Sequence, residues 1–416
     1  MKKHKKSILI FVSFFGIIAF LFSIYRPLFS AEEKVIAIKA GKIQTITKGL
    51  IENGTILIRN DRIVEIGTQV DIPSDAEVFN FKDKFVMPGV VSPDSSIGIL
   101  GPTGPTGGGQ NLANYPVLYS VYPEHPDYRM ALMNGLTTLA VSPPPAGISG
   151  LGVVIKPYGD KLKDILVKDK AFLKITVYVN TPFWNMLKGA LEEAKRKLDD
   201  QKKKQEEMKK KEEEKKKAKE NEQEEEEKEE ATISETAKVF MEVLEGKYPI
   251  IAECSQPASI SYLLELIAEY SKIKLIIRGG PDTYKAGDIL KRKKIPVILT
   301  PAIMTRLRWS IAERTNYILK CQGLGLKIAF QAAGDIENQI HLFHSLNHLF
   351  QFGVKSDVLL KGVTIVPAEL LGVDKLVGSL EKGKKADLIV FKDDPLKNIP
   401  VIEKVMLRGR FVNDEI

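Results

Sequence analysis

The chain has 416 residues, of which 44% are hydrophobic, so it can bury a large core and is too apolar to be disordered throughout. Its formal net charge is +8, but five lysine and arginine residues lie within the first 26 positions, which leaves +3 for the remainder. No basic patch interleaved with aromatic residues occurs in that remainder. The charge distribution therefore argues against nucleic-acid binding.

Residues 1–31 have the pattern of an export signal. Lysines at positions 2, 3, 5 and 6 precede an uninterrupted apolar run, Ile8 to Tyr25, and small residues follow at Ser30 and Ala31. The run is at the lower limit of what spans a bilayer, so the segment is either a cleaved signal peptide or an N-terminal membrane anchor. In both cases we expect the body to be exported, in the periplasm or the extracellular space, because the lysines stay in the cytoplasm.

Residues 32–87 are predicted to form the first part of a small β-domain. Short runs of alternating apolar and polar residues occur in VIAIKAGKIQTI, GTILIRNDRIVEIG and AEVFNFKDKFVMPG. Turns are predicted between these runs at Asn53–Gly54 and Asn60–Asp61.

Residues 88–362 alternate β-like runs with amphipathic stretches. The candidate strands are TTLAVS, LKITVYV, YPIIAE, IKLIIRG, IPVILT and LKIAFQA. Alternating units of this length predict a parallel sheet covered by helices, either open or closed into a barrel. In a barrel, functional side chains are expected at the C-terminal ends of the strands.

A charged insertion, residues 191–232, interrupts this alternation. Its lysine and glutamate residues favour a helix through i,i+4 pairs, but it lacks an apolar stripe that would let a helix pack. We expect a solvated helical or disordered insertion, and its composition selects no partner.

The last segment, residues 363–416, returns to β character in KKADLIVFKDDPL and VIEKVMLRGRFV. These runs are predicted to pair with the N-terminal β-segment in one composite domain.

Three collinear groups of residues resemble the amidohydrolase superfamily, in particular its imidazolonepropionase-like and dipeptidase-like branch. They are GTILIRNDRIVEIG with VMPG near the N-terminus, HPDYRMALMNGLTTLAVSP with GLGVVIKPYG in the middle, and TIVPAELLGV, GSLEKGKKADLIVF and VMLRGRFV near the C-terminus. The resemblance implies an α/β fold: a (β/α)8 TIM-type barrel over residues 88–362, a barrel-closing helix at the start of 363–416, and a composite β-sandwich domain formed by the two end segments.

The family's chemistry uses one or two divalent metals, such as zinc or manganese, at the C-terminal ends of the barrel strands. Histidine and carboxylate ligands hold the metal, which lowers the pKa of a bound water. An aspartate after the last strand acts as the proton shuttle.

The corresponding positions of this chain lack that ligand set. Where the family has His-x-His after VMPG, the chain has Asp94-Ser95-Ser96. The bridging carboxylate or modified lysine falls on Val179, and the later histidines and the aspartate fall on other residue types as well. The degenerate positions are Asp94, Ser96, Val179, Glu253, Gly279 and Ala333. The resemblance therefore implies no catalytic residue, no metal ligand and no cofactor.

Two other metal sites remain as alternatives. Asp94, Glu253 and Asp335 could offer oxygen ligands to magnesium, calcium or manganese, although they would need further oxygen ligands. His341, His344 and His348 share one face of a predicted helix, in a spacing that suits zinc, but the leucines of that helix predict a packed, structural role.

The sequence thus predicts an exported amidohydrolase-like pseudoenzyme, a subunit or scaffold that forms a homo-oligomer or pairs with an intact amidohydrolase. One alternative is a hydrolase of non-peptide or cyclic C–N bonds with an altered zinc or manganese site. Another is a small-ligand binding protein that uses Asp94, Glu253, Arg278 and Asp335 at the barrel mouth. Membrane contact is expected only through residues 1–31, if they are not cleaved, and no contact with nucleic acid is expected.

Overall fold

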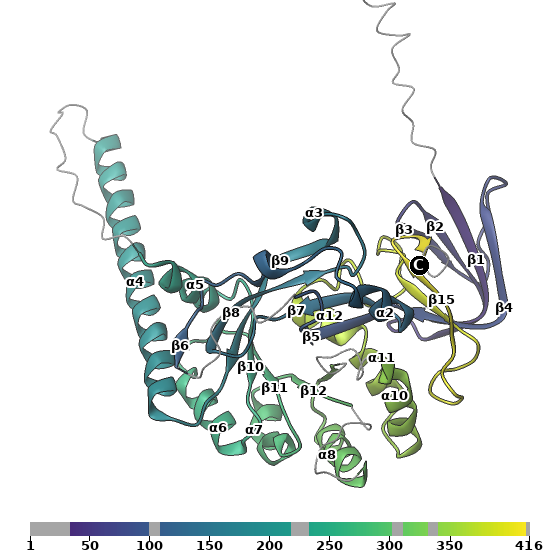
Figure 1. The fold of residues 1–416 in the computed structure, drawn as a ribbon. Helices are drawn as coiled ribbons and strands as arrows, with labels where there is room; N and C mark the ends of the chain where they lie inside the picture. Colours follow the sequence, from purple (N-terminus) through teal and green to yellow (C-terminus); the bar gives the residue numbers. More distant parts are fainter. Residues whose placement is uncertain (1–33, 100–108, 218–232, 302–310, 332–339, 413–416) are drawn as a thin grey trace, which may run out of the picture.

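The computed structural model describes residues 34–99, 109–217, 233–301, 311–331 and 340–412, and these form two sheets that lie beside each other (Figure 1). The predicted leader, residues 1–31, lies outside the described residues. Within the described ranges, no helix combines the length and the apolar character needed to cross a membrane.

The first sheet joins the two ends of the chain. Its strand order is β16-β15-β14-β4-β1-β2-β3. The strands are β1 (Val35–Gln44), β2 (Leu50–Arg59), β3 (Arg62–Gly67), β4 (Glu77–Pro88), β14 (Leu388–Phe391), β15 (Ile402–Leu407) and β16 (Arg410–Phe411). The main apolar core of the sheet includes Ile38, Ile56 and Leu388, and a smaller cluster contains Val35 and Leu57. A bridge between Arg62 and Lys385 links strand β3 to the segment before β14.

One predicted turn in this sheet is wrong. Asn53 and Gly54 lie inside β2, where Gly54 pairs with Ala40 of β1. Asn53 has the left-handed φ of 50° that suggests a turn, but it distorts the strand without ending it. The chain reverses instead between β1 and β2, at Gly49 with a φ of 83°, whereas the predicted turn at Asn60 does separate β2 from β3.

The second sheet is a nearly closed barrel. Its order is β13-β12-β11-β10-β9-β8-β7-β5, with β6 (Gln110–Asn111) attached to β8, and its end strands β13 and β5 contact each other. The strands are β5 (Val90–Ser95), β7 (Leu136–Val141), β8 (Gly147–Ile155), β9 (Leu166–Thr176), β10 (Ile250–Glu253), β11 (Leu275–Arg278), β12 (Val297–Leu299) and β13 (Ile328–Phe330). All six candidate strands of the sequence occur in it.

Strand β8 departs from the predicted parallel alternation. It pairs antiparallel with both β7 and β9 and replaces a crossover helix between them. Periodicity did not predict this strand, because the glycines of its sequence, GISGLGVVI, interrupt the apolar pattern. A Cβ at Gly152 would overlap the ring of Phe172, so this strand needs glycine to pass the large side chain inside the barrel.

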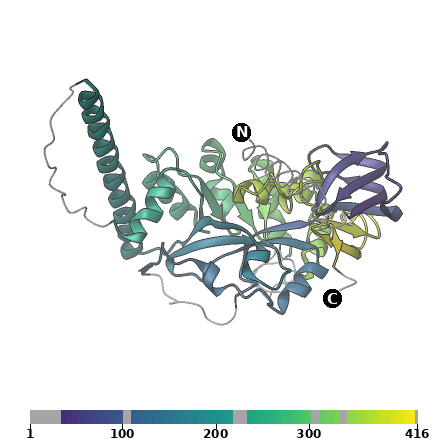
Figure 2. The ribbon, with the colours of Figure 1, turned by 90° about the horizontal axis from the view of Figure 1, so that it is seen from above.

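Helices cover the outside of the barrel and one of its ends (Figures 1 and 2). They are α2 (Asp127–Met133), α3 (Leu162–Ile165), α4 (Thr181–Lys217), α5 (Glu235–Leu244), α6 (Pro257–Leu266), α7 (Gly287–Arg292), α8 (Ile311–Gly323), α10 (Leu342–Gln351), α11 (Ser356–Gly362) and α12 (Ile365–Leu371), with 3-10 turns η1 (Val117–Ser120) and η2 (Thr283–Ala286). Ala368 and Leu371 of α12 pack against side chains inside the barrel, so α12 closes the end opposite to the C-terminal ends of the parallel strands.

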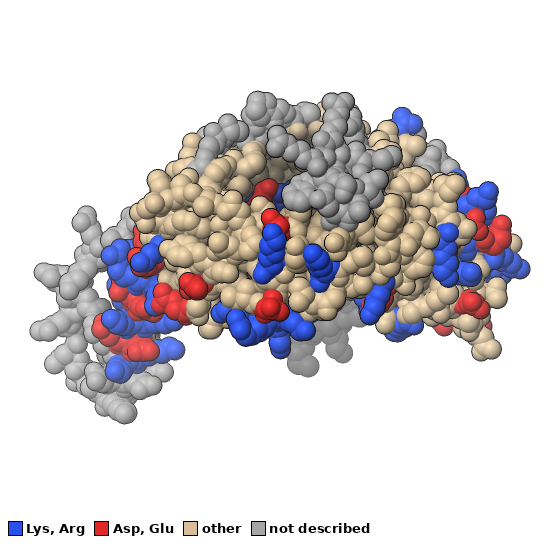
Figure 3. Space-filling view, turned by 90° about the horizontal axis from the view of Figure 1, so that it is seen from below, with Lys and Arg blue, Asp and Glu red and all other residues tan. Residues whose placement is uncertain are grey.

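Helix α4 extends far from the barrel as an arm (Figure 2). It begins at Thr181, ten residues before the predicted insertion, and buries Phe183, Leu187, Leu191 and Ala194. Beyond Ala194, Leu198 still packs half-buried against the core, whereas the side chains of residues 199–210 are exposed and mostly charged. Figure 3 shows acidic and basic atoms mixed along the arm. Residues 218–232 of the insertion lie outside the described residues.

The architecture confirms the predicted α/β class. A barrel-like sheet with one antiparallel strand stands beside a sheet built from both ends of the chain. The C-terminal ends of β5, β7, β9, β10, β11, β12 and β13 meet at one open end, the barrel mouth.

Candidate functional site at the barrel mouth

Strand alternation directs a layer of polar side chains into the barrel mouth. Apolar side chains on successive strands, including Phe172, Ile251, Ile276 and Ala329, pack together inside the barrel. Because residues two apart on a strand face the same side, the residues two positions later also point inward. These residues are Lys174 on β9, Glu253 on β10, Arg278 on β11 and Gln331 after β13.

Asp94 at the end of β5 is the centre of this layer. Its Oδ2 lies 2.7 Å from Lys174 Nζ and 2.7 Å from Arg278 Nε, and its Oδ1 accepts a hydrogen bond from Ser142 Oγ. The residue as a whole is 5% exposed. Two cations and one hydroxyl therefore compensate a carboxylate that has almost no access to water.

Glu253 and Arg278 form an outer pair. Arg278 Nη1 donates to Glu253 Oε1, and Arg278 Nε also donates to Gln331 Oε1 at 2.8 Å. Glu253 Oε2 lies 3.8 Å from Lys174 Nζ, so it contacts the inner pair only weakly. The side chains of Glu253 and Arg278 are 37% and 26% exposed, against 7% for Asp94 and 4% for Lys174.

The four charged groups sum to zero. Burial alone would raise the pKa of Asp94, but the nearby charges of Lys174 and Arg278, with hydrogen bonds from Lys174 and Ser142, outweigh it and hold the pKa below its ordinary value. Asp94 is thus ionised at neutral pH, and the mouth is a compensated ionic network.

The structure brings together three of the four residues predicted for a ligand site at the mouth. Asp94, Glu253 and Arg278 belong to the network, whereas Asp335 lies outside the described residues. Ala333 is also outside them, and Gln331 is the last described residue that follows β13 into the mouth. Ser96 is exposed, one residue past the end of β5.

The position assigned to Val179 needs correction. Val179 lies three residues beyond the end of β9 and is 63% exposed, so its side chain does not belong to the buried layer around Asp94. The β9 side chain in the layer of Asp94 is Lys174, which sequence analysis missed because it placed the strand end too late. The signal was a lysine within FLKIT, at an inward position two residues after Phe172.

Gly279 is correctly placed next to the mouth but cannot carry a ligand. A Cβ built there would overlap the hydroxyl of Thr283, so the position has no space for a histidine side chain. The residue before it, Arg278, provides the side chain that β11 directs inward.

The mouth residues that the structure describes do not fit a divalent metal. Among the described residues, no group of three or more histidine, cysteine, aspartate or glutamate side chains could hold an ion. Asp94 and Glu253 already bind two cationic side chains, and a metal between them would face the Lys174 ammonium. A divalent ion about 4 Å from one unit charge is repelled by about 8 kcal/mol at an effective dielectric constant of 20.

The predicted histidine stripe lies elsewhere. His344 and His348 are on α10, and His341 precedes its first turn. His348 stacks near Phe352, its Nε2 is buried without a hydrogen-bond partner, and burial lowers its pKa. Phe343 of the same helix packs against Phe391 of the first sheet, which gives α10 a structural role between the barrel and that sheet.

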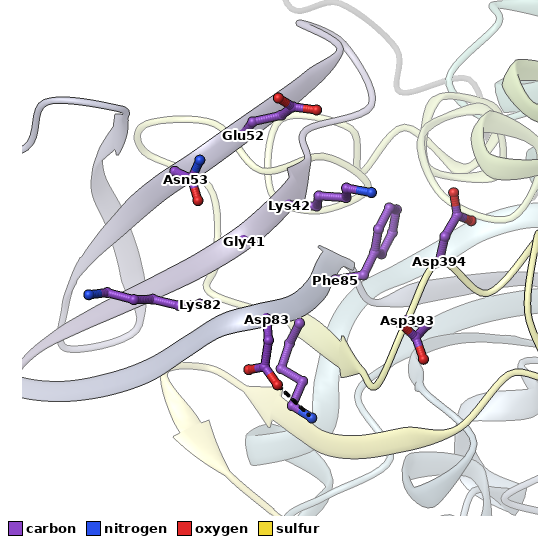
Figure 4. A pocket seen from close by; sticks show the side chains of 10 residues that line it. Gly41, Lys42, Glu52, Asn53, Lys82, Asp83, Phe85, Asp393 and Asp394 are labelled. Atoms are coloured by element: carbon purple, nitrogen blue, oxygen red, sulfur yellow. Dashed lines mark ion pairs between the residues drawn. The ribbon is translucent and has the colours of Figure 1, made fainter.

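A hollow of about 320 Å³ lies in the terminal sheet next to β1 and β4. Figure 4 shows that the side chains of Glu52, Lys82 and Asp393, which line it, point in different directions. Asp83 is paired with Lys84 at 3.5 Å, and Asp394 caps the backbone amide of Leu396 at 3.0 Å. No set of side chains converges there on a ligand.

Comparison with known proteins agrees with this fold. Residues 305–412 match the sequence profile of the amidohydrolase family. A 5-methylthioadenosine/S-adenosylhomocysteine deaminase from Saccharophagus degradans is 38% identical over 63 residues, which are 15% of this chain and only 14% of that protein.

Solved structures match over almost the whole chain. An amidohydrolase from Thermotoga maritima aligns with a TM-score of 0.76 and 23% identity, over 91% of this chain and 99% of that chain. Molinate hydrolase aligns with a TM-score of 0.56 and 12% identity, over 92% and 96% of the two chains. The chain therefore has the fold of these amidohydrolase structures, and the sequence profile supports the resemblance over residues 305–412.

Proposed function

Since the chain has the amidohydrolase fold and carries the family's C-terminal sequence, we propose that it is a non-catalytic member of the superfamily. The supporting observation is that Lys174 and Arg278 stand between Asp94 and Glu253 at the mouth. The family mechanism needs a metal that activates water, and here two fixed cations neutralise both carboxylates of the layer. The mouth therefore holds a network that maintains the shape of the barrel end without an activated nucleophile.

The proposed role is that of an exported subunit or scaffold. The basic and apolar pattern of residues 1–31 supports export to the periplasm or beyond, with or without retention at the cytoplasmic membrane. A barrel without its own chemistry can still associate, either with a second copy or with an intact amidohydrolase. We expect no binding to nucleic acid, because little net positive charge remains beyond the leader.

A second candidate is a hydrolase of C–N bonds with an altered zinc or manganese site. The observation in its favour is Lys174, since relatives bridge their metals with a carboxylate or a modified lysine and this lysine reaches the same barrel end. Against it, Lys174 is already bound to Asp94 as a cation, and no described histidine accompanies it in the layer.

Hydrolysis by the full-length chain tests the proposal. The rates with dipeptides and cyclic amides are measured with added zinc or manganese, in the native chain and in the variants Lys174→Met and Asp94→Asn. We expect each of the three proteins to hydrolyse these substrates no faster than the buffer with the same metal does without protein. Activity of the native chain that both substitutions abolish would establish the second candidate instead.

A further inference from the structure

The ionic network at the mouth has two tiers that differ in access to water. The inner pair, Asp94 and Lys174, has side chains that are 7% and 4% exposed. The outer pair, Glu253 and Arg278, is 37% and 26% exposed, and its two residues face each other in register on the adjacent strands β10 and β11. A molecule entering the mouth meets the outer pair first, and it can separate Glu253 from Arg278 while Asp94 keeps both Lys174 and Arg278 as partners.

The charge balance restricts what such a molecule can be. The four groups sum to zero, so a bound anion or cation would add an uncompensated charge to a partly buried site, which is unfavourable. A zwitterion avoids this cost: its ammonium replaces Arg278 as the partner of Glu253, and its carboxylate replaces Glu253 as the partner of Arg278. The pair between Glu253 and Arg278 that opens is then replaced by two pairs with the ligand, and the net charge of the site stays at zero.

The spacing further restricts the class. Neighbouring strands lie about 4.8 Å apart, and Glu253 and Arg278 extend from paired positions on two of them. In a free α-amino acid the ammonium and the carboxylate are attached to one carbon, so the two charges are close enough to contact two side chains that themselves touch. In a peptide each further residue can move the charged termini about 3.4 Å farther apart, so the termini of an extended chain of several residues cannot contact both side chains.

A third group at the same level has no partner. Thr176 pairs in register with Glu253 on the other side of β10, and its Oγ1 is buried without a hydrogen-bond partner. It stands two residues after Lys174 on β9, so it points to the same interior side of the strand. Buried hydroxyls are nearly always hydrogen-bonded, and a ligand carboxylate or ammonium beside Glu253 would supply the missing partner.

From these observations we propose that the barrel mouth binds a free α-amino acid, with its ammonium on Glu253, its carboxylate on Arg278 and a hydrogen bond to Thr176. This inference rests on the proposed function, because a metal in the mouth would compete for the same carboxylates. It would give a barrel without catalysis the role of a ligand sensor or carrier.

Thermal unfolding and titration calorimetry of the full-length chain test the inference. The twenty standard amino acids are screened at 10 mM for a rise in melting temperature, because a ligand that binds only the folded state stabilises it by mass action. Each amino acid that raises it is compared with its N-acetyl derivative and its carboxamide, each of which lacks one charge. We expect at least one amino acid to bind and both derivatives to bind at least tenfold more weakly.

Variants assign the contacts. Glu253→Gln and Arg278→Lys should each weaken binding at least tenfold, and Thr176→Val severalfold. The matched control is Glu269→Gln, which removes a carboxylate from the exposed pair with Lys195 on the outside of the barrel and should leave the dissociation constant unchanged.

Two results would overturn the inference: no amino acid stabilises the chain, or the blocked derivatives bind as well as the free amino acids. Neither result would alter the hydrolysis rates, so failure of this inference is distinguishable from failure of the proposed function. Conversely, a metal-dependent hydrolysis rate would defeat the proposed function whether or not amino acids bind.

Discussion

The two ends of the barrel each hold a buried lysine–aspartate pair, and the pairs differ in what surrounds them. At the closed end, Lys156 Nζ contacts Asp387 Oδ2 and donates to Thr138 Oγ1 at 2.7 Å, while Asp387 Oδ1 accepts from the Arg408 amide at 2.8 Å. Both charged side chains there are at most 3% exposed. At the mouth, Lys174 and Asp94 are buried almost as deeply but have a second, partly exposed pair above them.

This difference in surroundings indicates that the closed-end pair is structural, whereas the mouth pair lies below a pair that solvent and ligands can reach. The closed-end pair links a residue after barrel strand β8 to one before sheet strand β14, so it fastens the two sheets together. Burial lowers the pKa of Lys156, and the neighbouring Asp387 charge only partly opposes this effect. The mouth pair lies where the family places its chemistry, and its outer tier remains open to exchange. Four predictions test this contrast, in order of decreasing effect.

The largest effect is expected from Lys156→Met. The substitution leaves Asp387 buried and unpaired, and breaking such a pair on one side costs about 4 kcal/mol of unfolding free energy. Urea unfolding followed by circular dichroism measures the loss. The double variant Lys156→Met with Asp387→Leu removes both charges and should recover much of the stability; a double variant as unstable as the single one would refute the pairing.

A smaller loss is expected from Asp94→Ala. It leaves Lys174 buried, but Glu253 lies 3.8 Å away and can turn toward it, so we expect a cost of about 3 kcal/mol. The same urea titration gives the value. A loss of unfolding free energy equal to or larger than that of Lys156→Met would show that the mouth pair is as inaccessible as the closed-end pair, and would contradict the proposed difference between the two ends.

The stability contributed by Asp94 should depend on pH. Its pKa in the folded chain is below the ordinary value of 3.8, so the carboxylate contributes its full stability above that value and loses it as the pH falls through the folded pKa. The difference in unfolding free energy between the native chain and Asp94→Asn should be constant from pH 7 to about 5 and shrink below pH 4. A difference that grows on acidification would show the opposite pKa shift.

The smallest effect is expected from Glu253→Gln. Its carboxylate is more than one third exposed, so water screens the pair with Arg278 and the cost should be about 1 kcal/mol or less. Loss of ligand binding with little loss of stability is the pattern that distinguishes an accessible pair from a structural one. A loss comparable to that of Asp94→Ala would assign Glu253 to the structural network.

Short apolar runs that end in turn residues, such as YPIIAE and IPVILT, predicted a parallel sheet covered by helices, and the family resemblance implied that this sheet closes into a barrel. Sequence analysis missed β8, since glycines interrupt the apolar pattern there; Gly150 has a φ of +121°, and Gly152 lies against the ring of Phe172. Asp94, Glu253 and Arg278 were predicted at the mouth from their places at strand ends. Lys174 was not, because the depth of a side chain in the mouth depends on the strand's register, which the sequence leaves open by several residues.

Metal content tests the central claim most directly. The full-length chain, produced with zinc, manganese and iron in the medium, is analysed by inductively coupled plasma mass spectrometry, beside Asp94→Asn prepared in the same way. The network of Asp94, Lys174, Glu253 and Arg278 predicts background metal in both proteins. Close to one metal per native chain, lost in the Asp94 variant, would contradict it and restore a metal centre to the barrel mouth.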